Sequence, residues 1–286
     1  MIADIPFDDF GGRGIPLHFA SANAYPPGAY RKLLTLMAAD YRVLAIHHRP
    51  LWPGSQPEEL KDWDGVADDL IRFFDQLSLR DVIGVGHSLG AVATMMASLK
   101  RPDLFRALVL IEPVFLPKHV LELLIAGTTL EDLDETRLIK ITRERRNGWT
   151  SRQEVFDHYR SKRVFRRLSD EGMWDYVRYG TFGENGDEIC LLYSPEWEAH
   201  IYSLPPTGVW ELIPEVTHPT LAMRARETDT LFEGAWSLWQ QLQPAARFKE
   251  FQGSGHLLPM EKPNDVAAEI KAFIAGLPPD QPGSYL

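Results

Sequence analysis

The sequence predicts an α/β fold in which a mostly parallel sheet is flanked by helices and a helical lid is inserted between two core strands. Apolar strand patterns alternate with amphipathic helix patterns over the first 113 residues, as they do in parallel βαβ units. From about residue 115 to 217 helical patterning rich in arginine and aromatic residues replaces this alternation, which resumes at residue 219. We therefore expect a core of residues 1–114 and 216–286 and a lid of residues 115–215.

The elements of the core can be placed in order. A run of three glycines, Gly11, Gly12 and Gly14, predicts a turn ahead of the first strand. The strands have nearly continuous apolar runs, which is typical of strands buried on both faces, and the helices have one apolar face. Strands are expected at 15–20, 41–47, 82–85, 106–111, 219–223 and 247–251, and helices at 30–39, 64–77, after residue 88, at 233–242 and at 264–275. No clean strand is predicted within the lid.

The amino-acid composition narrows the classes of protein to which the chain can belong. With 44% hydrophobic residues the chain of 286 residues can bury a large core, and its net charge of −10 argues against affinity for nucleic acid or anionic membranes. The single cysteine, Cys190, excludes an internal disulfide and suits a reducing compartment. The N-terminus is acidic where a signal peptide is basic, and no apolar run approaches the ~18 residues of a membrane span. A cytoplasmic protein is expected.

A G-x-S-x-G motif carries the chemistry. Ser88 lies at the centre of Gly86-His87-Ser88-Leu89-Gly90, between an apolar strand and a small-residue helix. At such a strand-to-helix elbow the serine oxygen stands clear of both elements, and side chains at the two glycine positions would collide with them. We expect Ser88 to be a nucleophile, although a serine that merely caps the following helix is the plain alternative.

A serine nucleophile needs a base and an acid, which follow it in the chain order Ser, acid, His. His256 lies in a glycine-rich loop directly after the last strand, at the carboxyl edge of the sheet where open α/β folds place their reacting groups. It is the expected base. Asp229, a few residues after the strand at 219–223, is the expected acid. Glu112, which ends the strand at 106–111, is the alternative acid.

The developing oxyanion needs two backbone donors. The first is expected from the N–H of Leu89, directly after the nucleophile, and the second from the loop after the first strand, at Asn23 or Ala22. The lid also carries a charge bias: between residues 137 and 167 there are eleven Lys and Arg residues against only Glu144, Glu154 and Asp157. A solvated helix face is the favoured interpretation, and a basic rim for an anionic substrate is the alternative.

These residues resemble the α/β-hydrolase superfamily over nearly the whole chain. GHSLG, RARETD and GSGHLLPMEKP are similar to its nucleophile, acid and histidine segments, and FASANAYPPGAY and HHRPLWPGS are similar to phrases of small esterase-like serine hydrolases. The resemblance implies the α/β-hydrolase fold with Ser88, Asp229 and His256 as the triad. The sequence departs from the pattern at Ser21 and Ala22, where such proteins usually have His-Gly.

The expected function is hydrolysis of carboxylic esters through an acyl-enzyme, as in carboxylesterases and lipases. The aromatic residues of the lid favour an apolar acyl or aryl group. No metal or organic cofactor is expected, because the chain has no H-E-x-x-H, paired cysteines or phosphate loop. The same triad also serves carbon–carbon bond hydrolases, cofactor-free haloperoxidases and acyl transfer to an alcohol. A non-catalytic small-molecule receptor that retains the triad is the alternative of another class.

Overall fold

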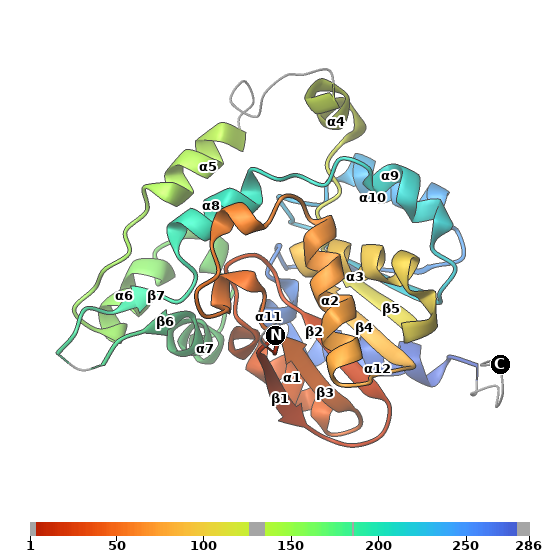
Figure 1. Ribbon diagram of the computed structural model, residues 1–286, viewed down its shortest axis with the longest axis horizontal. Coiled ribbons are helices and arrows are strands. Elements are labelled where there is room, and N and C mark those ends of the chain that lie inside the picture. The colour runs from red at the N-terminus through yellow and green to blue at the C-terminus, as the bar shows by residue number, and fades with distance from the viewer. Residues whose placement is uncertain (1–3, 126–134, 185, 279–286) are drawn as a thin grey trace.

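The computed structural model describes residues 4–125, 135–184 and 186–278. Its main sheet has seven strands in the order β1-β3-β2-β4-β5-β8-β9, and every neighbouring pair is parallel except β1 with β3 (Figure 1). The strands are β1 (Phe7–Gly11), β2 (Pro16–Ala20), β3 (Arg42–Ile46), β4 (Val82–His87), β5 (Phe105–Ile111), β8 (Thr220–Ala225) and β9 (Arg247–Phe251). The predicted α/β fold with a mostly parallel sheet is confirmed.

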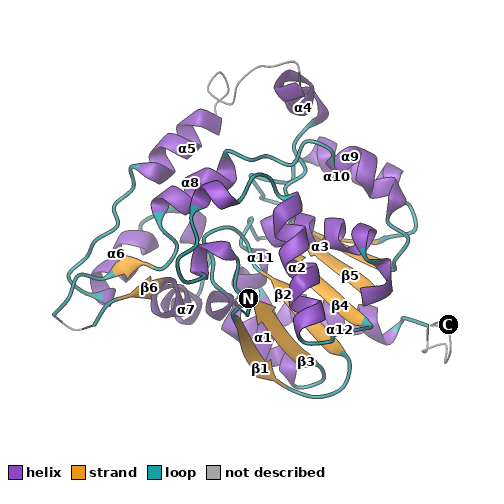
Figure 2. Cartoon of the chain, in the orientation of Figure 1, coloured by secondary structure: helices purple, strands orange, loops and turns teal. Residues whose placement is uncertain are grey.

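Helices cover both faces of this sheet (Figure 2). Alternate side chains of a strand enter two separate cores: on β5, Val109 and Ile111 pack on one side, and Leu108 and Leu110 pack on the other. The first core is closed by α1 (Arg31–Ala38) and α12 (Pro263–Ala275), and the second by α2 (Asp64–Gln76), α3 (Leu89–Lys100) and α10 (Glu233–Leu242). Two-sided burial explains the continuous apolar runs of the central strands.

The first strand is a correction to the sequence-based prediction. Residues 7–11 form β1, which pairs antiparallel with β3 at the edge of the sheet, where a turn was expected to precede the first strand. The sequence of this strand lacks the apolar alternation typical of a strand, because Asp8 and Asp9 stand between Phe7 and Phe10. Their charges are matched on β3: Arg42 pairs with Asp9, and His47, just beyond β3, lies 2.9 Å from Asp8.

Between β5 and β8 the chain inserts a segment, residues 112–219, which we call the inserted segment. Helices α5 to α8 lie beside the carboxyl end of the sheet, at the left of Figure 1. Its described elements are α4 (Lys118–Ile125), α5 (Glu135–Arg143), α6 (Arg152–Arg160), α7 (Asp170–Gly180), β6 (Thr181–Phe182), β7 (Cys190–Leu191), α8 (Pro195–Tyr202) and α9 (Val209–Leu212). The short antiparallel pair β6–β7 corrects the expectation that no strand occurs here; two-residue strands carry no periodicity to detect.

The inserted segment is packed on the core through α7. This helix lies against a short 3-10 turn, Pro27–Tyr30, that follows β2. The contact is so close that a Cβ on Gly28 would lie 2.2 Å from Cγ of Tyr179. Arg31 Nε donates to Asp175 across the same contact, at 2.9 Å. None of the helices in the described ranges is long and apolar enough to cross a membrane.

Candidate active site

Ser88 occupies a strained turn between β4 and α3. Its φ of 56° and ψ of −116° are unusual for a residue with a side chain, and its N–H donates to the carbonyl of Ile111 at 3.0 Å. The turn requires its two glycines: a Cβ on Gly86 would lie 2.3 Å from the carbonyl oxygen of Gly90, and one on Gly90 would lie 2.1 Å from the carbonyl oxygen of Ala20. The elbow therefore packs directly on the end of β2, as the motif predicts.

His256 reaches Ser88 from the loop after β9. Its Nε2 lies 3.0 Å from Ser88 Oγ. Glutamates on either side hold the loop: Glu227 accepts from the N–H groups of Gly253 and Ser254, and Glu261 accepts from the N–H of Gly255 at 2.7 Å. Because these backbone donors are fixed, the imidazole is held by its loop as well as by its side-chain partners.

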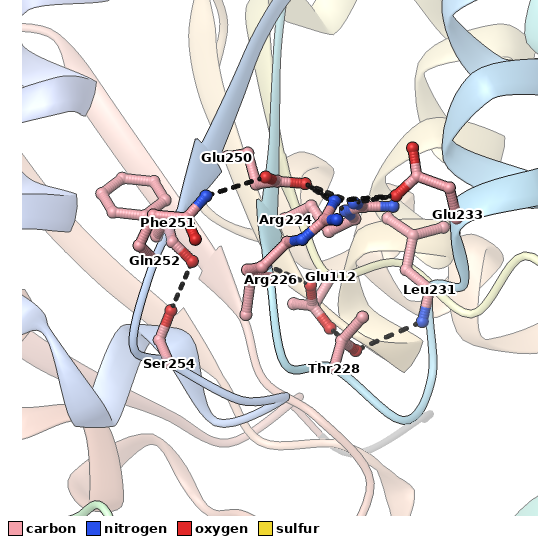
Figure 3. A network of polar contacts seen from close by, with 11 residues as sticks. Glu112, Arg224, Arg226, Thr228, Leu231, Glu233, Glu250, Phe251, Gln252 and Ser254 are labelled. Atoms are coloured by element: carbon pink, nitrogen blue, oxygen red, sulfur yellow. Dashed lines mark hydrogen bonds and ion pairs between the residues drawn. The ribbon is translucent and has the colours of Figure 1, made fainter.

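Glu112 lies on the other side of the imidazole. Its Oε2 is 3.1 Å from His256 Nδ1, and the side chain is fully buried. The carboxylate also accepts from the N–H of Ala225 at 2.6 Å and from the hydroxyl of Thr228 (Figure 3). The residue has a left-handed φ of 49°, directly after β5, which pairs with the strand that ends in His87. Neighbouring parallel strands therefore deliver Ser88 and Glu112 to the same edge of the sheet.

Asp229, the acid expected from the sequence, is not the carboxylate that contacts His256. Its carboxylate forms an ion pair with Arg163 of the inserted segment at 3.0 Å, and its side chain is 55% exposed. The loop after β8 turns so that Thr228, one residue earlier, faces inward and binds Glu112 instead. The carboxylate of Asp229 is directed toward its own arginine partner and not toward His256. The alternative acid, Glu112, is the one that contacts His256.

A buried arginine lies beside this acid in the same network. Arg224, on β8, is 2% exposed and pairs with Glu250 and Glu233, with its guanidinium 5.2 Å from the ring centroid of Trp236 (Figure 3). Arg226 pairs with the same two glutamates from the surface. This ion-pair network fixes β8 against β9, and through β8 it fixes Ala225, the backbone donor to Glu112.

The hydrogen-bond partners of His256 determine which of its ring nitrogens carries the proton. A buried carboxylate accepts, so His256 Nδ1 carries a proton toward Glu112, and Nε2 is left as the acceptor for the hydroxyl of Ser88. This is the tautomer in which histidine can remove a proton from serine.

A second hydrogen-bonded row braces the site and was not anticipated from sequence. Burial lowers the pKa of His87 well below its usual value, so the ring is neutral. Nε2 of His87 donates to the carbonyl of His256 at 2.8 Å, and Nδ1 accepts from the hydroxyl of Tyr30 at 2.8 Å. The Tyr30 hydroxyl in turn accepts from the N–H of Ala22 at 3.3 Å. The row joins the elbow, the histidine loop and the loop after β2.

The expected oxyanion donors lie beside the elbow. Leu89 is the first residue of α3, where backbone N–H groups have no intrahelical partner. Asn23, 5% exposed, lies in the loop after β2, and its Nδ2 donates to the carbonyl of Glu198 at 3.1 Å. Where related proteins have His-Gly, the loop is held through His48, whose Nε2 donates to the carbonyl of Ser21 at 3.0 Å; burial lowers the pKa of His48 to about 4.

Within residues 4–125, 135–184 and 186–278 no group of three or more His, Cys, Asp or Glu side chains is arranged to hold a metal ion.

The fold and this site define a class of protein. A sequence model of the alpha/beta hydrolase family matches residues 14–269, so the chain belongs to the alpha/beta hydrolase family.

Three similar proteins were compared with the chain. A probable esterase of Oryza sativa subsp. japonica is 31% identical over 131 residues, which are 44% of this chain and 47% of the relative. A karrikin insensitive 2 receptor of Petunia hybrida is 32% identical over 129 residues, 43% of this chain and 46% of the relative. The chain thus matches less than half the length of each. The crystal structure of E-2-(acetamidomethylene)succinate hydrolase superposes with a TM-score of 0.76 at 19% identity, covering 94% of both chains.

Proposed function

We propose that this protein is a serine hydrolase of carboxylic esters that uses Ser88 as nucleophile, His256 as base and Glu112 as acid. The observation that carries the proposal is the unbroken hydrogen-bonded row from Ser88 Oγ through both nitrogens of His256 to Glu112. The similarity to an esterase supports the reaction class. Glu112 is thus proposed as the acid in place of Asp229, the acid expected from the sequence.

The reaction proceeds in two steps. His256 Nε2 takes the proton of Ser88 as Oγ attacks the ester carbonyl, and Glu112 stabilises the imidazolium that forms. The N–H groups of Leu89 and Asn23 hold the oxyanion of the tetrahedral intermediate. The proton passes to the leaving alcohol, which departs and leaves an acyl-serine. Water then attacks this ester, with His256 as base, and the carboxylic acid is released.

The inserted segment acts in this proposal as a lid over the site, as its position beside the carboxyl end of the sheet supports (Figure 1). Its buried aromatic residues, among them Phe165 and Tyr176, pack with Tyr25 of the loop after β2. Such a surface suits an apolar acyl or aryl group.

The test is covalent labelling with a fluorophosphonate, located by mass spectrometry, together with hydrolysis of 4-nitrophenyl esters from acetate to decanoate. We expect one adduct, on Ser88, and turnover that falls about 10⁶-fold in kcat for Ser88→Ala. Thr94→Ala is the control, because this hydroxyl is buried on α3 and bonded to the carbonyl of Gly90 at 2.7 Å. Labelling elsewhere, or unchanged turnover in Ser88→Ala, would contradict the proposal.

A receptor is the second candidate, favoured by the similarity to the karrikin insensitive 2 receptor. The same experiment distinguishes a receptor from an enzyme. A receptor that retains the triad gives the Ser88 adduct and at most one acyl group released per protein molecule, whereas the enzyme continues through many turnovers.

A further inference from the structure

A charged and phenolic cluster lies between the inserted segment and the loop after β2. Arg145, which follows α5, forms an ion pair with Glu198 on α8. The ring of Tyr176 lies 5.4 Å from that of Tyr25 and 5.3 Å from that of Tyr159. We call Arg145, Glu198, Tyr25, Tyr159, Tyr176 and Tyr202 the Arg145 cluster.

The cluster is rich in hydrogen-bond donors. Burial acts against the charge of Arg145, but Glu198 and the surrounding phenols offset it, and the pKa of the guanidinium is raised. Burial raises the pKa of Tyr25 and Tyr176 well above the ordinary value, so their hydroxyls keep their protons. One permanently charged guanidinium therefore faces neutral phenols and a single carboxylate.

Two buried donors in this region have no hydrogen-bond partner within the described residues. Arg145 Nε is enclosed without an acceptor, although the side chain as a whole is 21% exposed. The hydroxyl of Tyr193, which lies outside the Arg145 cluster in a side chain 2% exposed, likewise has no partner; burial and, to a lesser extent, the charge of Glu198 raise the pKa of this phenol. An unsatisfied buried donor costs about 1–3 kcal/mol, which a ligand that supplies acceptor oxygens would recover. A carboxylate is the group whose geometry matches a guanidinium edge.

The cluster is connected to the candidate active site. Glu198, the partner of Arg145, accepts through its backbone carbonyl from Asn23 Nδ2 at 3.1 Å, and Asn23 lies in the loop packed against the serine elbow. The cluster thus contacts the loop after β2, which borders Ser88.

We infer that Arg145 binds an anionic end of the substrate, so that the preferred esters have an acyl chain ending in a carboxylate. This inference rests on the proposed function and names its substrate class. The apolar stretch of the acyl chain would lie along the aromatic rings, and its terminal carboxylate would accept from Arg145 and the phenols. Glu198 competes with the substrate for the same guanidinium in the free enzyme.

The test compares two esters of equal length, mono-4-nitrophenyl adipate and 4-nitrophenyl hexanoate. We expect kcat/KM of the wild type to be at least about 10-fold higher for the adipate, the equivalent of one charged hydrogen bond. In Arg145→Met this ratio falls about 10-fold or more. Arg143→Met, an exposed arginine two residues away, is the matched control and leaves the ratio unchanged.

A second variant separates substrate binding from a purely structural ion pair. Glu198→Gln removes the competing carboxylate, so the adipate-to-hexanoate ratio rises above that of the wild type. If the pair only supported the fold, both variants would lower the two rates in parallel, and the inference would be wrong. If the wild type hydrolyses hexanoate and is labelled at Ser88 but rejects the adipate, the inference fails and the proposed function stands. If neither ester is hydrolysed and Ser88 is not labelled, the proposed function fails first.

Discussion

Glu112 and Asp229 both follow a strand at the same edge of the sheet, but only Glu112 is shielded from water. Glu112 is fully buried and accepts from a backbone N–H, a hydroxyl and His256. Asp229 is half-exposed and pairs with Arg163, which is itself 75% exposed. An ion pair so open to solvent contributes about 0–1 kcal/mol to stability.

Replacing each carboxylate by its amide tests this difference. Glu112→Gln should lower kcat for 4-nitrophenyl butyrate about 10³–10⁴-fold, because a neutral amide neither fixes the tautomer of His256 nor stabilises its protonated form. Asp229→Asn should change kcat less than about 3-fold. Steady-state kinetics of both variants at pH 7.5 decide the matter, and a larger loss in Asp229→Asn than in Glu112→Gln would reverse the assignment.

The choice between these two residues marks the limit of prediction from the sequence. The contact between Ser88 and His256 could be expected from the sequence, because a glycine-bounded elbow and a glycine-rich loop after the last strand place both residues at the carboxyl edge of the sheet. The acid depends on which way the loop after β8 turns, and this is fixed by contacts between distant residues, such as that of Thr228 with Glu112. The row from Tyr30 to His87 has no local sequence signal for the same reason.

At the scale of the element, the docking of α7 on the turn after β2 determines how the inserted segment sits on the core. The contact combines a close approach, Gly28 with Tyr179, and ion pairs of Arg31 and Lys32 with acidic residues of α7. Since the same turn ends in Tyr30, which holds Ala22 and His87, the contact also supports the loop that borders the candidate oxyanion site.

Filling the space at Gly28 should loosen this contact. Gly28→Ala places a Cβ 2.2 Å from Cγ of Tyr179, and we expect it to lower the free energy of unfolding by roughly 1–3 kcal/mol. Tyr179→Ala in the same chain should restore most of the loss, since the ring is the obstacle. Gly208→Ala is the control, because a Cβ there meets nothing within 4 Å. Urea unfolding of the wild type, Gly28→Ala, Tyr179→Ala, the double variant and Gly208→Ala checks the prediction; additive losses would show that ring and methyl do not collide.

Elements of the core were predicted well where burial imposes a pattern, as in β9 and α10, whose bounds agree with those expected. The edge strand β1 and the short pair β6–β7 were missed. At the edge one row of hydrogen bonds and one covered face suffice, so charged residues such as Asp8 are tolerated and the apolar alternation is lost. Two-residue strands are stabilised by their surroundings rather than by their own residues.

At the scale of the whole molecule, two further histidines besides His87 are enclosed in the protein as neutral groups. Burial lowers the pKa of His18 to about 3 and that of His48 to about 4, from an ordinary value of 6.5. His18 lies on β2 with its ring 4.9 Å from that of Phe74 and 5.5 Å from that of Phe73. Below pH 6.5 the unfolded chain binds protons at these sites and the folded protein does not, so stability falls as the pH falls.

The expected loss reaches about 1.4 kcal/mol per pH unit for each histidine between about pH 6 and pH 4. His18→Leu removes one of the two groups, so its free energy of unfolding should fall less steeply than that of the wild type between pH 7 and pH 5. His119→Leu, at an exposed position on α4, serves as the control and should keep the wild-type slope. Urea titrations at the two pH values measure the difference, and equal slopes in His18→Leu and wild type would refute it.

Ser88 and Glu112 end the neighbouring strands β4 and β5, whereas His256 arrives from β9, after the whole inserted segment. A chain severed within that segment would leave Ser88 and Glu112 on one fragment and His256 on the other. Under the proposed function neither fragment alone could cleave an ester. Activity would return only when β8 paired with β5 again. Hydrolysis of a chromogenic ester would then report the association of the two fragments, and the protein would serve as a split reporter of proximity between two fused partners.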